Sequence, residues 1–240
     1  DFEQPDSAQW KTRWDQVAYD SEFQVGALGL NHKYLAGSST YLNTTIATTG
    51  KDVLYDFDRL DDSLLLRDEE SIDRFNGKTT ITSAFTHKFS PSLNNTSGII
   101  WNYLIYDMTL QSIVDNDPET YQTFVDESGS TQLLQAYTQT EYSVSNSLEF
   151  NAGFHYQYFL LNGNTSIEPR AGLSWKMHPN HSLSFGYGKH SQVEDLQYYL
   201  ATQETAEGRV QPNKNLDFVK ADHFVLAYDF QVSPTTRIKI

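Results

Sequence analysis

The feature that most constrains the fold is a strict alternation of apolar and polar residues over unusually long stretches. Between Leu148 and Leu160 every second residue is large and apolar or alanine, whereas the residues between them include Glu149 and His155. Successive side chains of a β-strand point to opposite faces, so this pattern predicts strands with one apolar and one polar face. The question is whether the apolar face meets a protein core or a lipid bilayer.

The segment 166–192 shows the same alternation twice, on either side of a turn built from Pro179 and Asn180. Its first half places Glu168, Arg170 and Lys176 on the polar face. Strands of about 12–16 residues exceed the usual length of about 5–6, whereas a tilted strand needs about 9–11 residues to cross a bilayer. The length of the alternating stretches therefore favours a membrane barrel.

The whole chain is predicted to be all-β, an antiparallel up-and-down meander of about ten strands that forms part of a transmembrane β-barrel. Tight turns rich in Gly, Pro, Asn and Ser alternate with longer connections, as in outer-membrane barrels. We expect a single unit over residues 1–240, with a leading loop at 1–21, long acidic loops at 56–73, 113–130 and 193–216, and short helical turns within 61–72 and 191–200. The predicted strands are 22–35, 40–55, 73–89, 96–112, 131–144, 147–160, 166–177, 182–192, 219–231 and 235–240.

Composition excludes several classes of protein. The formal charge of −14 disfavours nucleic acid and anionic membrane surfaces, which are themselves polyanions. The absence of cysteine excludes disulfide scaffolds and thiolate chemistry. No apolar run reaches about 18 residues, so no transmembrane helix is expected.

Several stretches together resemble a known family. The sequences IEPRAGLSW at 167–175, HSLSFGYGKHSQ at 181–192 and NKNLDFVKADHFVLAYDF at 213–230 resemble the barrel of TonB-dependent outer-membrane receptors, of the type that carries a carboxypeptidase-regulatory-like domain. The resemblance covers residues 23–240 and implies an internal fragment of a barrel of about 22 strands.

The resemblance also implies a function and a location. It implies nutrient uptake across the outer membrane of a Gram-negative cell, with the barrel in the lipid bilayer and the long loops extracellular. The ligand would be a small molecule, glycan or peptide caught by those loops. Transport would be driven by the TonB energy-coupling system through a plug that is expected to be absent from this chain.

Two sets of residues are candidates for function. Glu168, Arg170, Lys176 and His155 share a polar face and are expected to line the lumen; on a soluble protein they would form a surface ladder of cross-strand pairs. Aromatic residues of the leading loop and long loops are candidate ligand contacts, although interfacial anchoring or simple packing also explains the tryptophans. They are Trp10, Trp14, Tyr121, Tyr198 and Tyr199.

We expect no catalytic site, metal site or cofactor. The sequence contains no Ser-His-Asp order and no Gly-rich phosphate loop, and the turn histidines His178 and His181 lack a third ligand. The acidic runs 56–62 and 115–117 offer oxygen ligands for calcium, but neither has the EF-hand spacing, and solvated loop charge explains them as well.

Two other classes of protein stay open at this point. A secreted or surface β-sandwich that binds glycans or acts as an adhesin would also show alternating strands. An outer-membrane enzyme on a closed ten-stranded barrel is the third hypothesis. An isolated fragment would expose its apolar face, so we expect that face to be covered by sheet-on-sheet packing or by oligomers.

Overall fold

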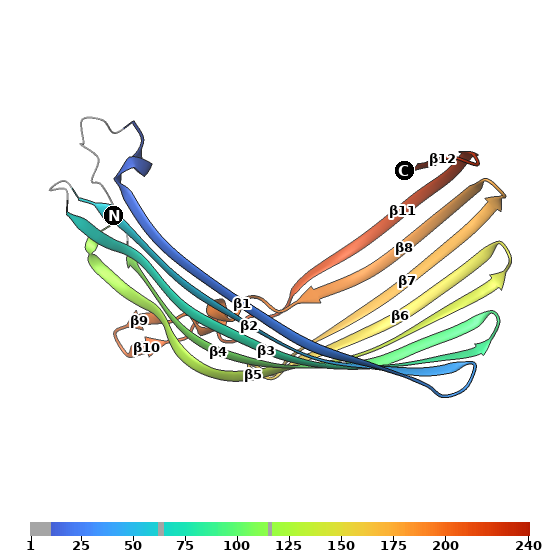
Figure 1. Ribbon diagram of the computed structural model, residues 1–240, viewed down its shortest axis with the longest axis horizontal. Coiled ribbons are helices and arrows are strands. Elements are labelled where there is room, and N and C mark those ends of the chain that lie inside the picture. Colours follow the sequence, from blue (N-terminus) through green and yellow to red (C-terminus); the bar gives the residue numbers. More distant parts are fainter. Residues whose placement is uncertain (1–10, 62–64, 115–116) are drawn as a thin grey trace.

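A computed structural model describes residues 11–61, 65–114 and 117–240 and shows one large antiparallel sheet (Figure 1). Its ten strands are paired in the order β1-β2-β3-β4-β5-β6-β7-β8-β11-β12, so each strand pairs with its neighbour in the chain except across the excursion between β8 and β11. The strands are β1 (Val17–Leu35), β2 (Thr40–Leu60), β3 (Leu66–Ser90), β4 (Leu93–Val114), β5 (Asp117–Ser145), β6 (Leu148–Phe159), β7 (Asn164–His178), β8 (His181–Gln192), β11 (Val219–Ser233) and β12 (Thr236–Lys239).

The remaining elements are small. A 3-10 turn, η2 (Arg13–Gln16), precedes β1. The excursion between β8 and β11 contains helix α1 (Leu196–Leu200) and a two-stranded hairpin of β9 (Gln203–Thr205) and β10 (Gly208–Val210). Within the described ranges neither η2 nor α1 provides a membrane-spanning helix.

The predicted meander is confirmed, but two of the predicted acidic loops are wrong. The 56–73 connection is largely strand, because β2 continues to Leu60 and β3 already begins at Leu66. Likewise, β4 runs to Val114 and β5 begins at Asp117. Of the stretch 61–72, in which a helical turn was expected, residues 66–72 are strand and residues 62–64 lie outside the described residues.

Cross-strand partners explain why these acidic segments pair instead of looping. Asp56 accepts a hydrogen bond of 2.7 Å from the Ser71 hydroxyl on the neighbouring strand. Arg59 forms an ion pair with Glu69, and a register shift at Phe57 accommodates the extra residue of β3. Cross-strand pairs of opposite charges, or of a hydroxyl with a carboxylate, stabilise paired strands. Acidic composition alone therefore does not indicate a loop.

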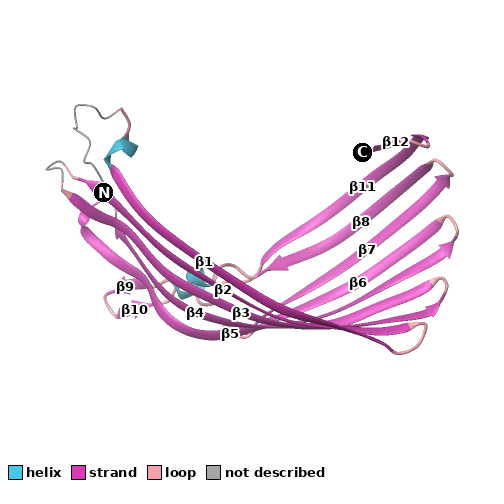
Figure 2. Cartoon of the chain, in the orientation of Figure 1, coloured by secondary structure: helices cyan, strands magenta, loops and turns pink. Residues whose placement is uncertain are grey.

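The sheet forms an open, strongly curved trough (Figures 1 and 2). Strands β1 to β5 are 19 to 29 residues long, whereas β6, β7 and β8 have 12 to 15, so one side of the trough extends much further. Among the described residues, β1 and β12 pair with only one strand each and not with one another. The hypotheses of a closed ten-stranded barrel and of a two-sheet sandwich are therefore wrong for this chain.

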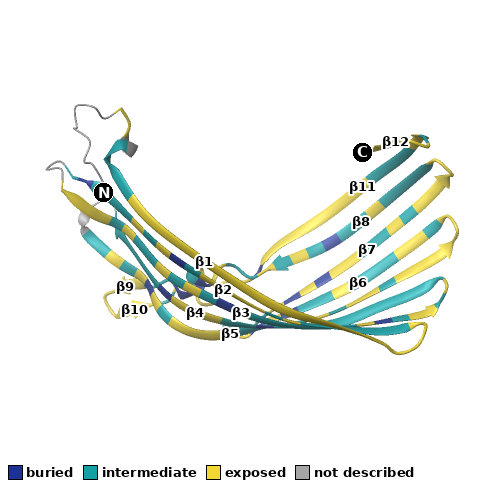
Figure 3. Ribbon diagram, viewed as in Figure 1, coloured by how far each residue is buried: buried dark blue, intermediate teal, exposed yellow. Residues whose placement is uncertain are grey.

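The pairing register sorts the side chains onto two faces. Phe150 pairs with Leu173, Leu173 with Phe185, and Phe185 with Leu226, so large apolar side chains line up across four strands. We call this face the outer face, and the opposite face, which carries Glu168, the inner face. Figure 3 shows that much of the sheet stays exposed.

The buried core lies on the inner face, which the sequence did not predict. Its members on the sheet are Tyr106 and Met108 of β4, Val125 of β5 and Phe159 of β6, and the excursion between β8 and β11 covers them. Phe150, Leu173 and Phe185 on the outer face each remain more than 40% exposed. The expected sheet-on-sheet packing of the apolar face is thus not found within the described chain; the excursion packs on the other side.

The outer face generates a test. Replacing Leu173 with Arg puts a charge into the apolar band and is expected to destabilise the full-length protein in lipid vesicles by about 2–4 kcal/mol, measured by urea unfolding. The neighbouring Ser174 faces inward, where its hydroxyl lies 3.0 Å from that of Ser184. Replacing Ser174 with Arg should cost about 1 kcal/mol at most. Equal costs at the two positions would contradict the assignment of faces.

Candidate functional site on the inner face

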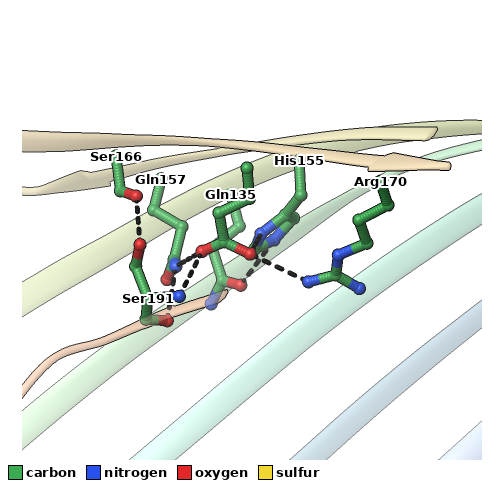
Figure 4. Close-up of polar contacts among 7 residues, drawn as sticks. Gln135, His155, Gln157, Ser166, Arg170 and Ser191 are labelled. Atoms are coloured by element: carbon green, nitrogen blue, oxygen red, sulfur yellow. Dashed lines mark hydrogen bonds and ion pairs between the residues drawn. The ribbon is translucent and has the colours of Figure 1, made fainter. Parts of the chain in front are cut away.

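A buried carboxylate, that of Glu168 on β7, organises the inner face. Its side chain accepts a hydrogen bond of 2.8 Å from Arg170 Nη2 at Oε2, and His155 Nδ1 lies 3.0 Å from the same oxygen. The other oxygen, Oε1, accepts hydrogen bonds from Gln157 Nε2 at 2.5 Å and from the backbone N–H of Ser191 at 3.0 Å. Figure 4 shows these polar side chains converging.

The strand register brings this cluster together. His155 of β6 is paired directly with Glu168 of β7, and Gln157 is paired with Ser166. The Ser166 hydroxyl donates a hydrogen bond of 2.6 Å to that of Ser191, which lies near the end of β8. An ionised carboxylate is costly to bury unless it is paired and hydrogen-bonded, and here both oxygens have partners from within the chain.

The predicted lumen-facing residues are therefore only partly brought together. His155, Glu168 and Arg170 form one cluster, but Lys176 lies near the tight turn at the other end of β7, where its backbone N–H donates to Ser147 O at 2.8 Å. Glu168 is only 1% exposed. Its interactions are with its own chain, and it holds Ser191 in β8, two residues before the β8–β11 excursion begins.

That excursion, Val193–Phe218, folds back onto the inner face, and we call it the inner strap. Helix α1 begins where the Asp195 side chain accepts a hydrogen bond of 3.2 Å from the Gln197 N–H, an N-cap. Leu196, Tyr199 and Leu200 follow at helical spacing and are all buried. The helical turn predicted within 191–200 is thus confirmed at 196–200.

The strap packs on the sheet through a continuous apolar contact. Phe159 and Tyr199 meet edge to face, with ring centroids 5.4 Å apart, and Phe218 completes the cluster. Burial raises the pKa of Tyr199, so its phenol stays neutral at physiological pH. Burying one large apolar side chain stabilises a fold by about 1.5–3 kcal/mol, so several such contacts can hold a short helix that would not form alone.

Polar contacts fasten the strap along its length. Arg74 of β3 donates to Gln197 Oε1 at 2.9 Å and lies 3.3 Å from an Asp195 carboxylate oxygen. Both the backbone N–H and the hydroxyl of Thr202 donate to Phe124 O, at 2.8 and 2.9 Å. The strap therefore spans the inner face from β3 to β6.

The far end of the strap is held by the turn between β6 and β7. The Nδ2 groups of Asn162 and Asn164 each donate to Leu216 O at 2.9 Å. Because this turn binds the strap just before Phe218, the chain is guided back into the sheet beside β8.

The aromatic candidates for ligand contact are dispersed. Tyr198 is half exposed on α1, whereas Tyr199 is 1% exposed inside the strap core. Tyr121 pairs with Ile113 and lies on the outer face, beside Asp56, Asp58 and Asp68. Trp10 and the side chain of Trp14 lie outside the described part of the structure.

The described residues contain no group of three or more His, Asp or Glu side chains that could hold a metal ion. His181 instead stacks on Phe230, with ring centroids 4.4 Å apart, and its Nδ1 lies 2.6 Å from the Tyr228 hydroxyl oxygen. Three residues of the acidic runs, Asp62, Asp115 and Asn116, lie outside the described residues.

Sequence reasoning missed most of the residues that hold the strap. Arg74, Ser191 and Val125 lie on separate strands, and nothing in their local sequence marks them as partners. One local signal was available: Asp195 followed by Leu196, Tyr199 and Leu200 is an N-cap before a one-faced apolar helix.

Comparison with known proteins identifies a family with this architecture. The sequence matches the family model described as "TonB dependent receptor-like, beta-barrel" over residues 2–236. No curated protein matches it. The family model does not distinguish the subtype with a carboxypeptidase-regulatory-like domain, which stays a prediction.

Solved structures share the fold at low identity. The ferric-catecholate import receptor Fiu from K12 E. coli superposes with a TM-score of 0.62 and 11% identity, covering 92% of this chain and 40% of that one. The siderophore receptor PiuA from Acinetobacter baumannii gives 0.60 and 15%, covering 88% and 38%. The RagAB peptide transporter gives 0.58 and 11%, covering 90% and 29%. The chain thus spans well under half the length of these structures.

The Glu168 cluster generates a test. Replacing Glu168 with Gln removes the charge and one acceptor, which leaves a buried donor unpaired and is expected to cost about 1–3 kcal/mol. Hydrogen exchange of amides 191–200 should then become about tenfold faster or more, because local opening becomes easier. Glu149 is exposed on the same face, and replacing it with Gln should leave that exchange unchanged. Unaltered exchange in both variants would show that Glu168 does not hold the strap.

Two adjacent tyrosines provide a second test. Replacing buried Tyr199 with Ala should destabilise the strap by about 3–5 kcal/mol, whereas replacing half-exposed Tyr198 with Ala should cost about 0.5 kcal/mol or less. Limited proteolysis of the folded receptor is expected to cleave within 193–218 only in the Tyr199 variant. Cleavage at the same rate in both variants would refute the packing of α1 on the sheet.

Proposed function

Because this chain belongs to the TonB-dependent receptor β-barrel family, we propose that it forms part of the wall of a receptor that imports a nutrient. Barrels of this family are outer-membrane proteins. The observation that carries the proposal is one curved sheet with an apolar outer face and a polar inner face, over the residues that match the family. The family members and structural neighbours are receptors and transporters, not enzymes.

We infer the orientation from the unequal lengths of the strands. The ends that include the turn between Leu35 and Thr40 face the periplasm, and the far ends of the long strands β1 to β5 extend outside the cell. The inner strap then lies within the lumen, where it narrows the passage along β3 to β6.

The strap supplies a fixed surface for the ligand. Its buried apolar core and its hydrogen bonds to Arg74 and Phe124 hold it against the wall, so Tyr198, which is half exposed on α1, is presented to the lumen. Preorganised contacts lose less ordering entropy on binding than mobile ones. The ligand is a small molecule, glycan or peptide, and its import is coupled to TonB through a plug.

The proposal is tested by uptake in cells. A strain deleted for the receptor is complemented with the full-length gene, with and without TonB, and compounds depleted from a defined medium are compared by mass spectrometry. We expect at least one compound to be depleted only when receptor and TonB are both present. Depletion that is independent of either component, or no difference among the strains, would contradict a role in TonB-dependent import.

A further inference from the structure

The inner strap leaves parts of the inner face uncovered, and one of these parts is aromatic. The register places Tyr19 opposite Phe57 and Phe23 opposite Val53, all on one face of β1 and β2. The register also pairs Val53 with Arg74 and Arg74 with Met108, which belongs to the buried core beneath the strap. These rings therefore share the inner face with the strap, which reaches β3.

We call Tyr19, Phe23, Tyr55 and Phe57 the aromatic wall. Tyr19 is 71% exposed and Phe23 61% exposed, and Val25 beside them is similarly open. Other exposed apolar side chains of the inner face, such as Leu35 and Val225, are aliphatic. Contiguous exposed aromatic surface inside a polar cavity is typical of ligand sites, which combine apolar walls with a few placed polar groups.

The charge beside the aromatic wall is positive, although the chain as a whole carries −14. The Lys51 ammonium lies 6.0 Å from the Phe23 ring centroid. In the part of the chain that the structure describes, neither Lys51 nor Lys78 forms an ion pair, and the register places both on the inner face.

Most carboxylates of β1 to β3 near Lys51 lie on the opposite, outer face of the sheet. Asp20, Asp52 and Asp56 lie on the outer face, because each alternates with a residue of the inner face. The exceptions lie beside Phe57: Glu70 pairs with Phe57, and Glu69 forms an ion pair with Arg59, which lies over the Phe57 ring. The inner surface around Lys51 therefore offers a cation without a carboxylate partner.

We propose that the aromatic wall and Lys51 bind an anionic ligand that contains a planar ring. This inference rests on the proposed import function and names the chemistry of its ligand. The ring stacks on Phe23 and its neighbours, while the anionic group meets the Lys51 ammonium. Lys33 provides an internal reference: its ammonium lies 4.3 Å from the Tyr41 ring centroid on the same face, but close to the tight turn of the same hairpin.

The test uses the purified full-length receptor and 4-fluorobenzoate as the probe, with binding followed by fluorine NMR line broadening. Replacing Lys51 with Gln, or Phe23 with Leu, should weaken binding at least threefold. Phe23→Tyr keeps the ring and should bind as the wild type does. Lys33→Gln is the matched control and should also leave binding unchanged. The difference in electrophoretic mobility between heated and unheated samples verifies that each variant is folded.

Competition experiments distinguish the contribution of the ligand's ring from that of its negative charge. Cyclohexanecarboxylate keeps the anion without a planar ring, and benzyl alcohol keeps the ring without the charge, so each should displace the probe at least threefold less well than benzoate. Equal displacement by either compound, absence of probe binding, or equal loss in the Lys33 and Lys51 variants would overturn the inference. Probe binding without TonB-dependent uptake would instead contradict the import function, and uptake that Lys51→Gln leaves intact would contradict this site alone.

Discussion

The structure depends on the register of the strand pairs, because the side-chain period of a strand is two. A slip of one residue between β6 and β7 would carry Leu173 to the inner face and Glu168 to the outer one. The same register aligns Phe150, Leu173 and Phe185 across neighbouring strands and brings His155 opposite Glu168. Lipid-facing surface and inner polar site are thus two consequences of one pairing pattern.

The inner strap shows how a membrane barrel wall can have a core without packing its apolar face. Lipid can cover the outer face, so no protein layer is needed there, and the only dry cluster among the described residues forms inside, around Tyr106 and Tyr199. The Glu168 carboxylate holds Ser191, two residues before the strap begins, and Asn162 and Asn164 bind the end of the strap. The strap covers the inner face from β3 to β6 and leaves the aromatic wall on β1 and β2 open.

Sequence reasoning succeeded where the signal was local. The stretch predicted as a strand at 147–160 is β6 at Leu148–Phe159, and the helical turn near Leu196 is present. It was wrong for the acidic segment 56–73, where pairs such as Asp56 with Ser71 stabilise strand. It also grouped Lys176 with Glu168, because a shared face says nothing about separation along the strand.

The sequence by itself determined that the chain forms long, two-faced, antiparallel strands with short turns at one end, since alternation and turn residues act between near neighbours. Only the tertiary structure decided where the apolar core lies, that Glu168 holds the strap, and that Phe23 and Lys51 stay uncovered. Those features depend on contacts such as Phe159 with Tyr199 and Arg74 with Asp195, between residues far apart in the chain. Such contacts carry no local periodicity and arise only when the sheet curves and the strap folds back across it.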